Sequence, residues 1–316
     1  MNRPIRPSHV HPAPIRLALV GIGKIARDQH LPAIAANPDF ALVAAVSRNA
    51  VIDGVANFRE LDALIASGLE IDAVSLCTPP VGRHRIAAAA RAQGWHVMLE
   101  KPPGATLGEV RALAAAPGPT LFASWHSREA AGVPAAKAFL AETRVTAAHI
   151  SWREDIRQWH PGQEWILEAG GLGVFDPGIN ALSILTEILP GRVRLESAIL
   201  DFPKGRGAPI AASLALVHDE AARITAEFDF RQEGPQSWDI TVETDAGPLM
   251  LHDGGERVTI AGAAQDVDGI GEYPALYRQF ASLIAANLSD CDLAPFELVA
   301  DAFLVGQRTE SPPFTF

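Results

Sequence analysis

The strongest constraint on the fold is a short apolar run that stops at a glycine-rich turn near the start of the chain. Ile15–Val20 is rich in branched residues and too short for a typical helix, which favours a buried strand. The pattern G-x-G-x-x-A follows it, as Gly-Ile-Gly-Lys-Ile-Ala at 21–26. Two glycines permit a tight turn and close approach of the backbone to a pyrophosphate, and a small third residue lets a helix pack on the sheet. The turn predicts dinucleotide binding, with a simple turn as the alternative.

Further apolar runs alternate with helical stretches up to about residue 127. We expect strands at Phe40–Val46, Ala73–Leu76, His96–Leu99 and Thr120–Ala123. We expect helices at Ile25–Ala36, at Arg83–Gln93, and from the capping box of Thr106 and Glu109 through Ala116. This α/β alternation predicts a Rossmann domain over 15–127, with a doubly wound parallel sheet that binds its ligand at the carboxyl ends of the strands.

After about residue 127 the pattern changes to strands with alternating apolar positions joined by Gly/Pro turns. We expect strands at Val145–Trp152, Arg194–Leu200, Ala211–Val217, Arg223–Phe230, Asp239–Thr244 and Arg257–Ile260, and helices at 172–189, 274–287 and 295–308. An α+β substrate-binding domain over 128–316, with an open, mostly antiparallel sheet, follows from this pattern. The helix over 295–308 is a candidate to pack back on the first domain, and 1–14 is expected to be a disordered leader.

Charge and cysteine usage exclude several classes of protein. The net charge of −11 disfavours nucleic-acid binding, which needs a positive field. No apolar stretch reaches the roughly 18 residues of a membrane span, and the start of the chain lacks the apolar region of a secretory signal. Two cysteines cannot make a disulfide framework or a four-thiolate zinc site. We expect a cytoplasmic protein with no metal.

Two strand ends carry residues suited to the cofactor and to proton chemistry. Ser47-Arg48 follows the second strand, and no acid occurs until Asp53. An Arg at this place suits a 2′-phosphate, which favours NADP with NAD also accepted, a solvated surface Arg being the alternative. Lys101, in Glu-Lys-Pro-Pro at 100–103, can donate to an oxygen that loses its proton.

The segment before the long helix of the second domain contains two polar residues four positions apart. Asp176 and Asn180 therefore lie on one face if the helix has begun there. The alternative is that Asp176 only caps a helix whose first residue is Pro177.

A dense aromatic and polar stretch precedes it. Trp152, Trp159 and Trp165 are either core residues or, together with Glu154 and His160, the apolar face and hydrogen-bonding edges that a sugar requires. His160 as a metal ligand is a weaker alternative, because no partner stands at a metal-site spacing.

Taken together, these residues resemble the Gfo/Idh/MocA family of oxidoreductases, which includes glucose–fructose oxidoreductase and inositol dehydrogenase. The segments at 21–26, 100–102 and 170–180 carry the resemblance, which covers nearly the whole chain after the leader. The stretches 21–32, 98–109 and 159–163 look most like the bacterial L-arabinose / D-galactose 1-dehydrogenases within that family.

The resemblance implies oxidation of D-galactose, L-arabinose or D-fucose at the anomeric carbon, giving the lactone and reduced cofactor. Asn180 stands where the broad family usually has His, and an amide cannot accept a proton. The resemblance thus points to Asp176 as the base, with Asn180 and Lys101 holding the oxygen. Oxidation at another sugar or cyclitol carbon, or a sensor that binds NAD(P) or sugar without turnover, are the alternatives.

By the same resemblance, further positions match binding residues of the family. The sugar is expected to contact His126, Glu154, His160 and Trp238. The cofactor is expected to contact Gly21, Ile22, Gly23, Lys24, Ile25, Ser47, Arg48, Thr78, Pro79, His84, Glu100 and Lys101. A homodimer through the open sheet of the second domain is also expected, since the family often uses that face for subunit contacts.

Overall fold

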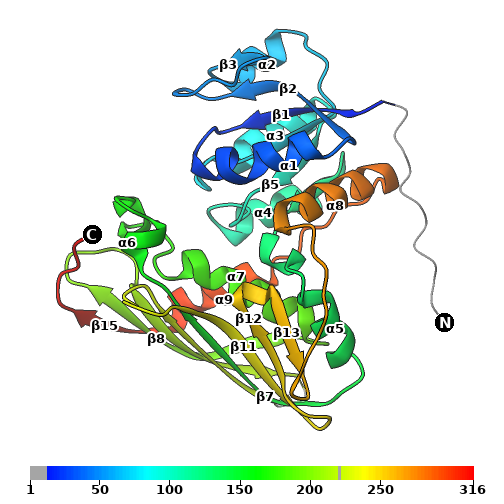
Figure 1. The fold of residues 1–316 in the computed structure, drawn as a ribbon. Helices are drawn as coiled ribbons and strands as arrows, with labels where there is room; N and C mark the ends of the chain where they lie inside the picture. Colours follow the sequence, from blue (N-terminus) through cyan, green and yellow to red (C-terminus); the bar gives the residue numbers. More distant parts are fainter. Residues whose placement is uncertain (1–12, 220–221) are drawn as a thin grey trace. The chain divides into compact units, whose positions relative to one another are not determined.

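The computed structural model describes residues 13–219 and 222–316, and it divides into two compact units (Figure 1). The first unit runs to Trp125 and also includes Tyr273–Asp292, and the second consists of His126–Glu272 and Leu293–Phe316. Apart from its last two residues, the expected leader at 1–14 lies outside the described residues. Among those residues, no helix has both the length and the hydropathy needed to cross a membrane.

The first unit contains a six-stranded sheet in which every neighbouring pair is parallel. Its strands are β1 (Ile15–Val20), β2 (Phe40–Val46), β3 (Ala56–Phe58), β4 (Ala73–Leu76), β5 (His96–Leu99) and β6 (Leu121–Ala123). Their order is β3-β2-β1-β4-β5-β6, that of dinucleotide-binding Rossmann folds, so the predicted fold is confirmed. The direction of the order reverses between β1 and β4, which is where such sheets bind their ligands.

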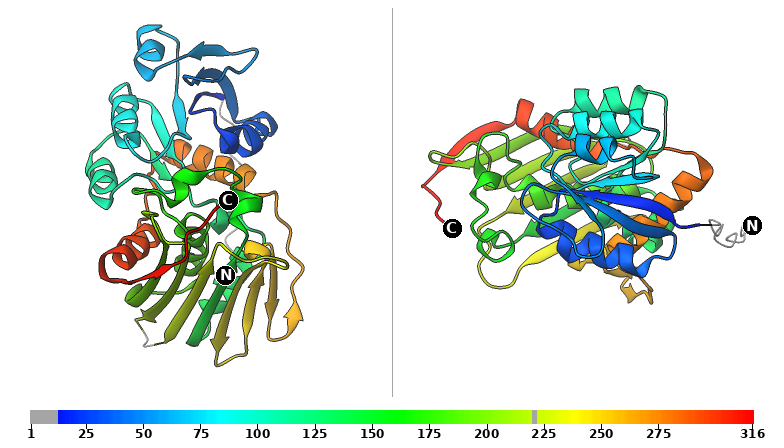
Figure 2. Two further views of the ribbon diagram at one scale, coloured as in Figure 1. Left: turned by 90° about the vertical axis from the view of Figure 1, so that its left-hand side faces the viewer. Right: turned by 90° about the horizontal axis from the view of Figure 1, so that it is seen from above.

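Helices cover both faces of this sheet, as the view from above in Figure 2 shows. They are the π-helix η1 (Ala26–His30), α1 (Leu31–Ala36), α2 (Leu61–Ala66), α3 (Arg83–Ala92), α4 (Leu107–Ala115) and most of α8 (Glu272–Ala286). Strand β1 alternates between the two sides: Leu17 and Leu19 pack in one apolar core and Ala18 and Val20 in the other. The capping box is confirmed, because the Thr106 hydroxyl accepts a hydrogen bond from the amide of Glu109.

The membership of α8 corrects the expected domain division. The sequence placed residues 273–292 in the second domain, whereas the structure places them in the first unit. The reason is tertiary packing: Tyr277 and Phe280 are buried in the same core as Leu17 and Phe40, and the rings of Phe40 and Phe280 stack at 5.9 Å. An apolar helix far along the chain completes the core of the nucleotide-type sheet.

The second unit contains a nine-stranded sheet in the order β14-β13-β12-β11-β7-β10-β9-β8-β15. Its strands are β7 (Val145–Arg153), β8 (Val193–Pro203), β9 (Ala211–His218), β10 (Arg223–Asp229), β11 (Ser237–Thr244), β12 (Leu249–His252), β13 (Arg257–Ile260), β14 (Ala263–Ala264) and β15 (Gln307–Ser311). Only the β7–β10 and β8–β15 pairs of this sheet are parallel, so the mostly antiparallel prediction is confirmed.

Helix α7 is the main helix on this sheet and belongs to its core. The other elements of the unit are η2 (His126–Glu129), α5 (Val133–Leu140), α6 (Ile156–Trp159), η3 (Glu164–Leu167), α7 (Phe175–Ile188), η4 (Asp253–Gly255) and α9 (Ala294–Val305). At Gly178 a Cβ would lie only 3.1 Å from the Phe228 ring, so glycine allows α7 to approach β10 closely. The Phe175 ring also contacts the Phe303 ring of α9, at 5.6 Å.

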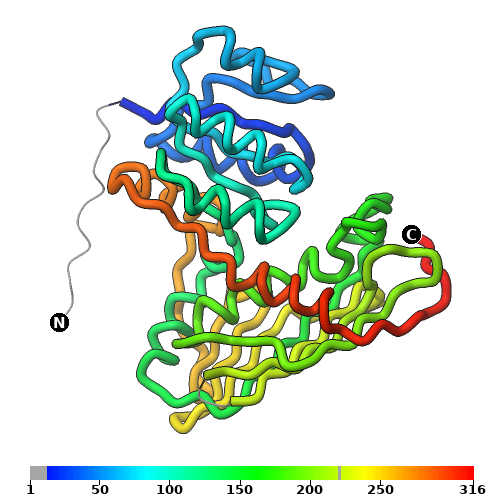
Figure 3. The backbone as a smooth tube through the Cα atoms, turned by 180° about the vertical axis from the view of Figure 1, so that it is seen from behind, coloured from blue at the N-terminus to red at the C-terminus, as the bar shows by residue number. Residues whose placement is uncertain are grey.

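The end of the last helix differs from the expected one. Helix α9 ends at Val305, and residues 307 and 308, which were expected to be helical, begin β15 (Figure 3). The edge of β8 supplies backbone partners for Gln307–Ser311, and these long-range partners override the local helical pattern. In addition, α9 belongs to the second unit, where it contacts α7 and β8.

Candidate active site

The glycine turn after β1 has a geometry that only glycine tolerates. Gly21 has a φ of +91°, and a Cβ at this position would lie 2.7 Å from the backbone nitrogen of Thr78. Around Gly23, by contrast, no atom lies within 4 Å of the Cβ position, so the backbone is open to an approaching group. A helical run begins directly afterwards at Lys24, and its amides point toward the turn. One closed and one open glycine are what a bound pyrophosphate requires.

The end of β4 faces the same turn and contains an unsatisfied polar atom. The Thr78 hydroxyl is buried and has no hydrogen-bond partner among the described residues. The Thr78 carbonyl accepts a hydrogen bond from Arg83 Nε at 3.0 Å, which fixes this strand end. A buried orphan hydroxyl beside the glycine turn fits a dinucleotide, because it offers a donor that the chain itself leaves unused. Pro79 is exposed next to it.

The remaining positions expected to bind the cofactor lie around the same strand ends of the first unit. Ser47 continues the β2–β3 pairing through its amide, 2.9 Å from the Phe58 carbonyl. Arg48 is largely exposed, and its Nε lies 3.1 Å from Glu60 Oε1. His84 Nδ1 lies 3.0 Å from Glu109 Oε1. Of the turn itself, Ile22 is buried, whereas Lys24 and Ile25 are exposed.

The end of β5 holds Lys101 by its backbone. The Lys101 amide donates to Glu100 Oε2 at 2.6 Å, and the Glu100 carboxylate is buried. Arg83 donates to the carbonyls of Glu100 and Pro102 on either side of Lys101. Burial lowers the pKa of the Arg83 guanidinium to about 10, so it is charged at neutral pH. The backbone around Lys101 is therefore fixed from two sides.

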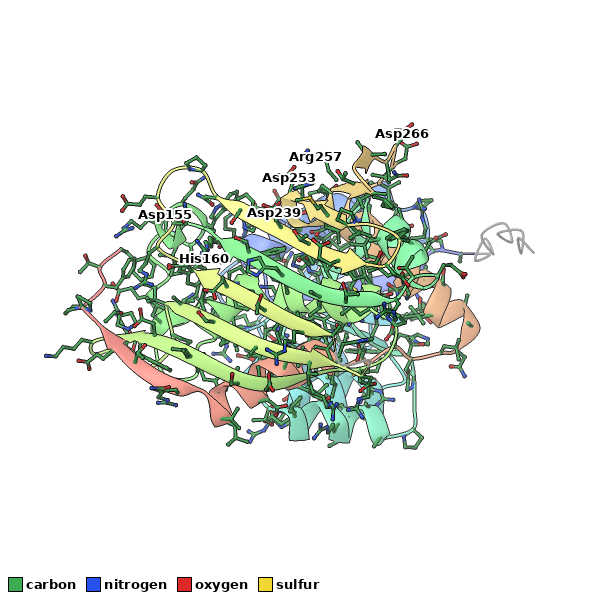
Figure 4. The ribbon with its side chains drawn as sticks, turned by 90° about the horizontal axis from the view of Figure 1, so that it is seen from below. Asp155, His160, Asp239, Asp253, Arg257 and Asp266 are labelled. Atoms are coloured by element: carbon green, nitrogen blue, oxygen red, sulfur yellow. The ribbon has the colours of Figure 1, made fainter. Side chains whose placement is uncertain are left out.

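In the second unit, three residues expected to contact the sugar converge with the proposed base. Glu154 follows β7 and is buried, and its Oε2 accepts the indole N–H of Trp238 at 2.9 Å. His160 Nε2 lies 3.8 Å from Glu154 Oε1 and 3.8 Å from Asp176 Oδ2. Figure 4 shows His160 at an end of the sheet, beside Asp155. We call Glu154, His160, Asp176 and Trp238 the carboxylate–histidine cluster.

Asp176 occupies the first turn of α7 but does not cap it. The N-cap position is Val174, and Pro177 is the third helical residue rather than the first. The capping alternative is therefore wrong. Asn180 lies one turn further along α7 and is partly buried, as the spacing predicted.

The three tryptophans before this helix differ in environment. Trp152 is 4% exposed and belongs to the core, whereas Trp159 and Trp165 are 45% and 55% exposed, so the core interpretation holds only for Trp152. The Trp159 ring meets the Trp238 ring edge-on at 5.6 Å. Its indole N–H donates to Gln236 Oε1 at 2.6 Å. Gln236 was missed by the sequence analysis, since nothing in a polar Gly/Pro loop marks it.

His126, the other expected sugar residue, lies in η2 of the same unit. Its Nδ1 is 2.8 Å from Glu272 Oε2.

Burial and the neighbouring Glu272 carboxylate raise the pKa of Glu256 in the same unit. Within the described residues, no group of three or more His, Cys, Asp or Glu side chains is arranged to hold a metal ion.

Comparisons with known proteins agree with this geometry. Residues 15–117 match the model of a family described as "Oxidoreductase family, NAD-binding Rossmann fold". The chain is 45% identical over 313 residues to galactose 1-dehydrogenase of Pseudomonas fluorescens, covering 95% of this chain and 99% of that protein. The chain belongs to the Gfo/Idh/MocA oxidoreductase family. The predicted resemblance is confirmed, and the protein is an NAD(P)-dependent oxidoreductase.

Two solved structures have a similar fold. D-galactose-1-dehydrogenase of Rhizobium etli is 52% identical, with a TM-score of 0.91 and coverage of 96% of this chain and 98% of that chain. A 3-ketoreductase of Actinomadura kijaniata, solved with TDP-benzene and NADP, has a TM-score of 0.78 at 18% identity, covering 95% and 100% of the two chains. At that identity the second likeness concerns the fold alone.

Proposed function

We propose that this family member is an aldose 1-dehydrogenase that oxidises D-galactose and sugars with the same ring configuration to their lactones. The observation that carries the proposal is the carboxylate–histidine cluster, in which two carboxylates face one imidazole beside an indole. Hydroxyl groups of a pyranose need such acceptors and donors, and its apolar face packs on an indole ring. The names of the two relatives that match nearly the full chain agree with this substrate class.

The contacts from His160 to the two carboxylates of the cluster are long. The two distances from His160 to the carboxylates exceed the length of a hydrogen bond. A sugar hydroxyl that bonded to both Glu154 and His160 would replace one long contact by two short ones. Trp238 holds Glu154 in place for this, because its N–H already binds one carboxylate oxygen.

The proposed chemistry needs one proton acceptor and one hydride acceptor. The cofactor, held at the glycine turn of residues 21–26, would supply the acceptor for the hydride from C1. Asp176 takes the proton of the anomeric hydroxyl as the C1–O bond becomes the lactone carbonyl. Lys101 and Asn180 donate hydrogen bonds to that oxygen and stabilise the charge that develops on it.

The substrates we propose share their configuration at carbons two to four and have an axial 4-hydroxyl. D-Galactose, L-arabinose and D-fucose differ only in the substituent at C5, so one set of hydroxyl contacts can serve all three. The exposed Trp159 ring and the half-buried Trp238 ring offer apolar surface for that substituent.

The cofactor preference we propose is NADP, with NAD accepted less tightly. This preference rests on Arg48, because a guanidinium after β2 can bind a 2′-phosphate and stack on adenine. Its present partner, Glu60, is an exposed carboxylate, and exposed pairs of this kind contribute less than about 1 kcal/mol. A phosphate can therefore displace Glu60 at little cost.

Steady-state kinetics with the three sugars and both cofactors test the proposal. We expect reduced cofactor to accumulate and the solution to acidify as the lactone opens. A ketone product would show oxidation at another carbon. No reduced cofactor at saturating sugar would support the sensor alternative instead.

A homodimer through the outer face of the nine-stranded sheet remains a proposal. Ile199 of β8 is 50% exposed on this unit, which leaves apolar surface that a second copy would cover. Light scattering of the purified chain gives the oligomeric state, and a Ile199→Glu variant that stays dimeric would exclude this face.

A further inference from the structure

A buried polar network in the first unit ends on the backbone of Lys101. Its centre is the Glu100 carboxylate, which is 4% exposed. Oε1 accepts the Tyr273 hydroxyl at 2.5 Å and lies 3.2 Å from His30 Nε2. Oε2 accepts the amide of Lys101 at 2.6 Å. The carboxylate therefore joins three separate parts of the chain.

His30 extends the network to the centre of the sheet. Its Nδ1 lies 2.8 Å from the Tyr277 hydroxyl, which donates to Ser75 Oγ at 3.0 Å. His30 ends the π-helix η1 that follows the glycine turn, Ser75 lies in β4, and both tyrosines belong to α8. The network thus connects the glycine-turn helix, two strands and α8, all within one unit.

The His30 ring is buried among polar groups. Burial alone would lower the pKa of His30, but the neighbouring Cys77 and Tyr277 and the hydrogen bond to Glu100 raise it well above its ordinary value. The groups facing the ring are Glu100, Tyr273, Tyr277 and Cys77. The raised pKa favours the imidazolium form of His30 beside the Glu100 carboxylate.

Stability does not explain such a pair. A buried ion pair contributes little net stability, because desolvation offsets the attraction, and an apolar core of equal volume serves as well. What the pair does provide is a fixed geometry. Of the two carboxylate oxygens, one is held by Tyr273 and His30 while the other holds the Lys101 amide.

We infer that His30, Tyr273 and Tyr277 are positioning residues that, through the Glu100 carboxylate, fix the backbone of Lys101 for its part in the reaction. The inference rests on the proposed function, in which Lys101 donates to the reacting oxygen. Tyr273 and Tyr277 are the two tyrosines of the sequence and lie one helical turn apart. In this inference they support Lys101, which lies more than 170 positions away in sequence.

Tyr273→Phe tests the inference with the smallest change, since it removes one hydroxyl and keeps the ring. We expect kcat to fall about tenfold, because small misplacements of a group that acts in the transition state are costly, while KM for sugar and for NADP stays within twofold. Phe280→Leu on the same helix is the matched control. It perturbs the same core without touching the network, so we expect a comparable fall in Tm and unchanged kcat.

Hydrogen exchange of the Lys101 amide, followed by NMR without sugar or cofactor, gives a readout that does not depend on turnover. We expect exchange about tenfold faster in Tyr273→Phe and unchanged in Phe280→Leu, because the amide is bonded to the carboxylate that Tyr273 holds. If the parent protein oxidised none of the sugars, the proposed function would fail while this measurement still decided whether the network holds Lys101. Unchanged exchange, or a kcat within twofold of the parent, would overturn the inference.

Discussion

Replacing Asp176 by Asn is the sharpest test of the proposed mechanism. The substitution keeps the size of the side chain on the first turn of α7 and removes its ability to take a proton. General-base catalysis contributes about 10²–10⁴ in rate, so we expect kcat to fall about 10³-fold, or about 4 kcal/mol in the barrier. Sugar affinity is expected to change little, because an amide still accepts and donates hydrogen bonds.

Glu154→Gln is the matched control that the structure offers. Both carboxylates lie 3.8 Å from His160 Nε2. Either substitution removes one negative charge at the same distance from the imidazole ring. A difference between the two variants therefore cannot come from charge alone. We expect Glu154→Gln to raise KM for the sugar about 10–100-fold, the effect of one charge-assisted hydrogen bond, with a much smaller change in kcat.

The assay is the absorbance of reduced cofactor under saturating sugar, with sugar binding to each variant measured by calorimetry. Asp176→Asn should bind sugar and not turn it over. A kcat within tenfold of the parent in that variant would refute Asp176 as the base. Equal losses of kcat in both variants would show that the cluster acts as one electrostatic unit.

The remaining predictions concern cofactor binding and catalysis by residues of the first unit, and the stability of the fold. Lys101→Ala should lower kcat about 10²–10³-fold, and a smaller effect would mean that Lys101 only positions the cofactor. Arg48→Ala should raise KM for NADP about tenfold and leave KM for NAD within twofold, so a clear NAD preference in the parent would contradict the assignment. Asp72→Asn should lower the free energy of unfolding at pH 7 by about 1 kcal/mol, because the hydrogen bonds from Arg16 lower the pKa of Asp72 and the pair is partly exposed. Since a lowered pKa stabilises the fold above the ordinary value of 3.8, urea titrations should show this difference disappearing as the pH falls through the lowered pKa.

The elements that the sequence predicted best are those whose local pattern and tertiary role agree. Ile15–Val20, Phe40–Val46 and His96–Leu99 have the expected bounds, because each is a largely apolar run that is mostly buried in a parallel sheet. Ala56–Phe58 was missed, since three partly exposed residues carry no such pattern. Gln307–Ser311 was misjudged because its strand exists only through pairing with β8, which no local feature indicates.

The candidate site shows the same limit. Three members of the carboxylate–histidine cluster, Glu154, His160 and Asp176, were predictable as candidates because they lie close together along the chain. The buried polar network around Glu100 was not predictable, because Tyr273 is separated from Glu100 by 173 residues. Its only local signals were a histidine at the end of the glycine-turn helix and two tyrosines at helical spacing, which are equally typical of an ordinary core.

The two carboxylates beside His160 differ in how the fold holds them, and this difference supports giving them different tasks. Glu154 is buried, and the indole N–H of Trp238, on the neighbouring strand β11, donates a hydrogen bond to one of its carboxylate oxygens. We expect a carboxylate fixed in this way to bind a sugar hydroxyl rather than to accept its proton, because protonation would weaken its bond to the indole N–H. Asp176 instead extends from the first turn of a helix, with Asn180 one turn behind it on the same face. In the mechanism that we propose, an amide donor placed there holds the reacting oxygen while the carboxylate takes the proton.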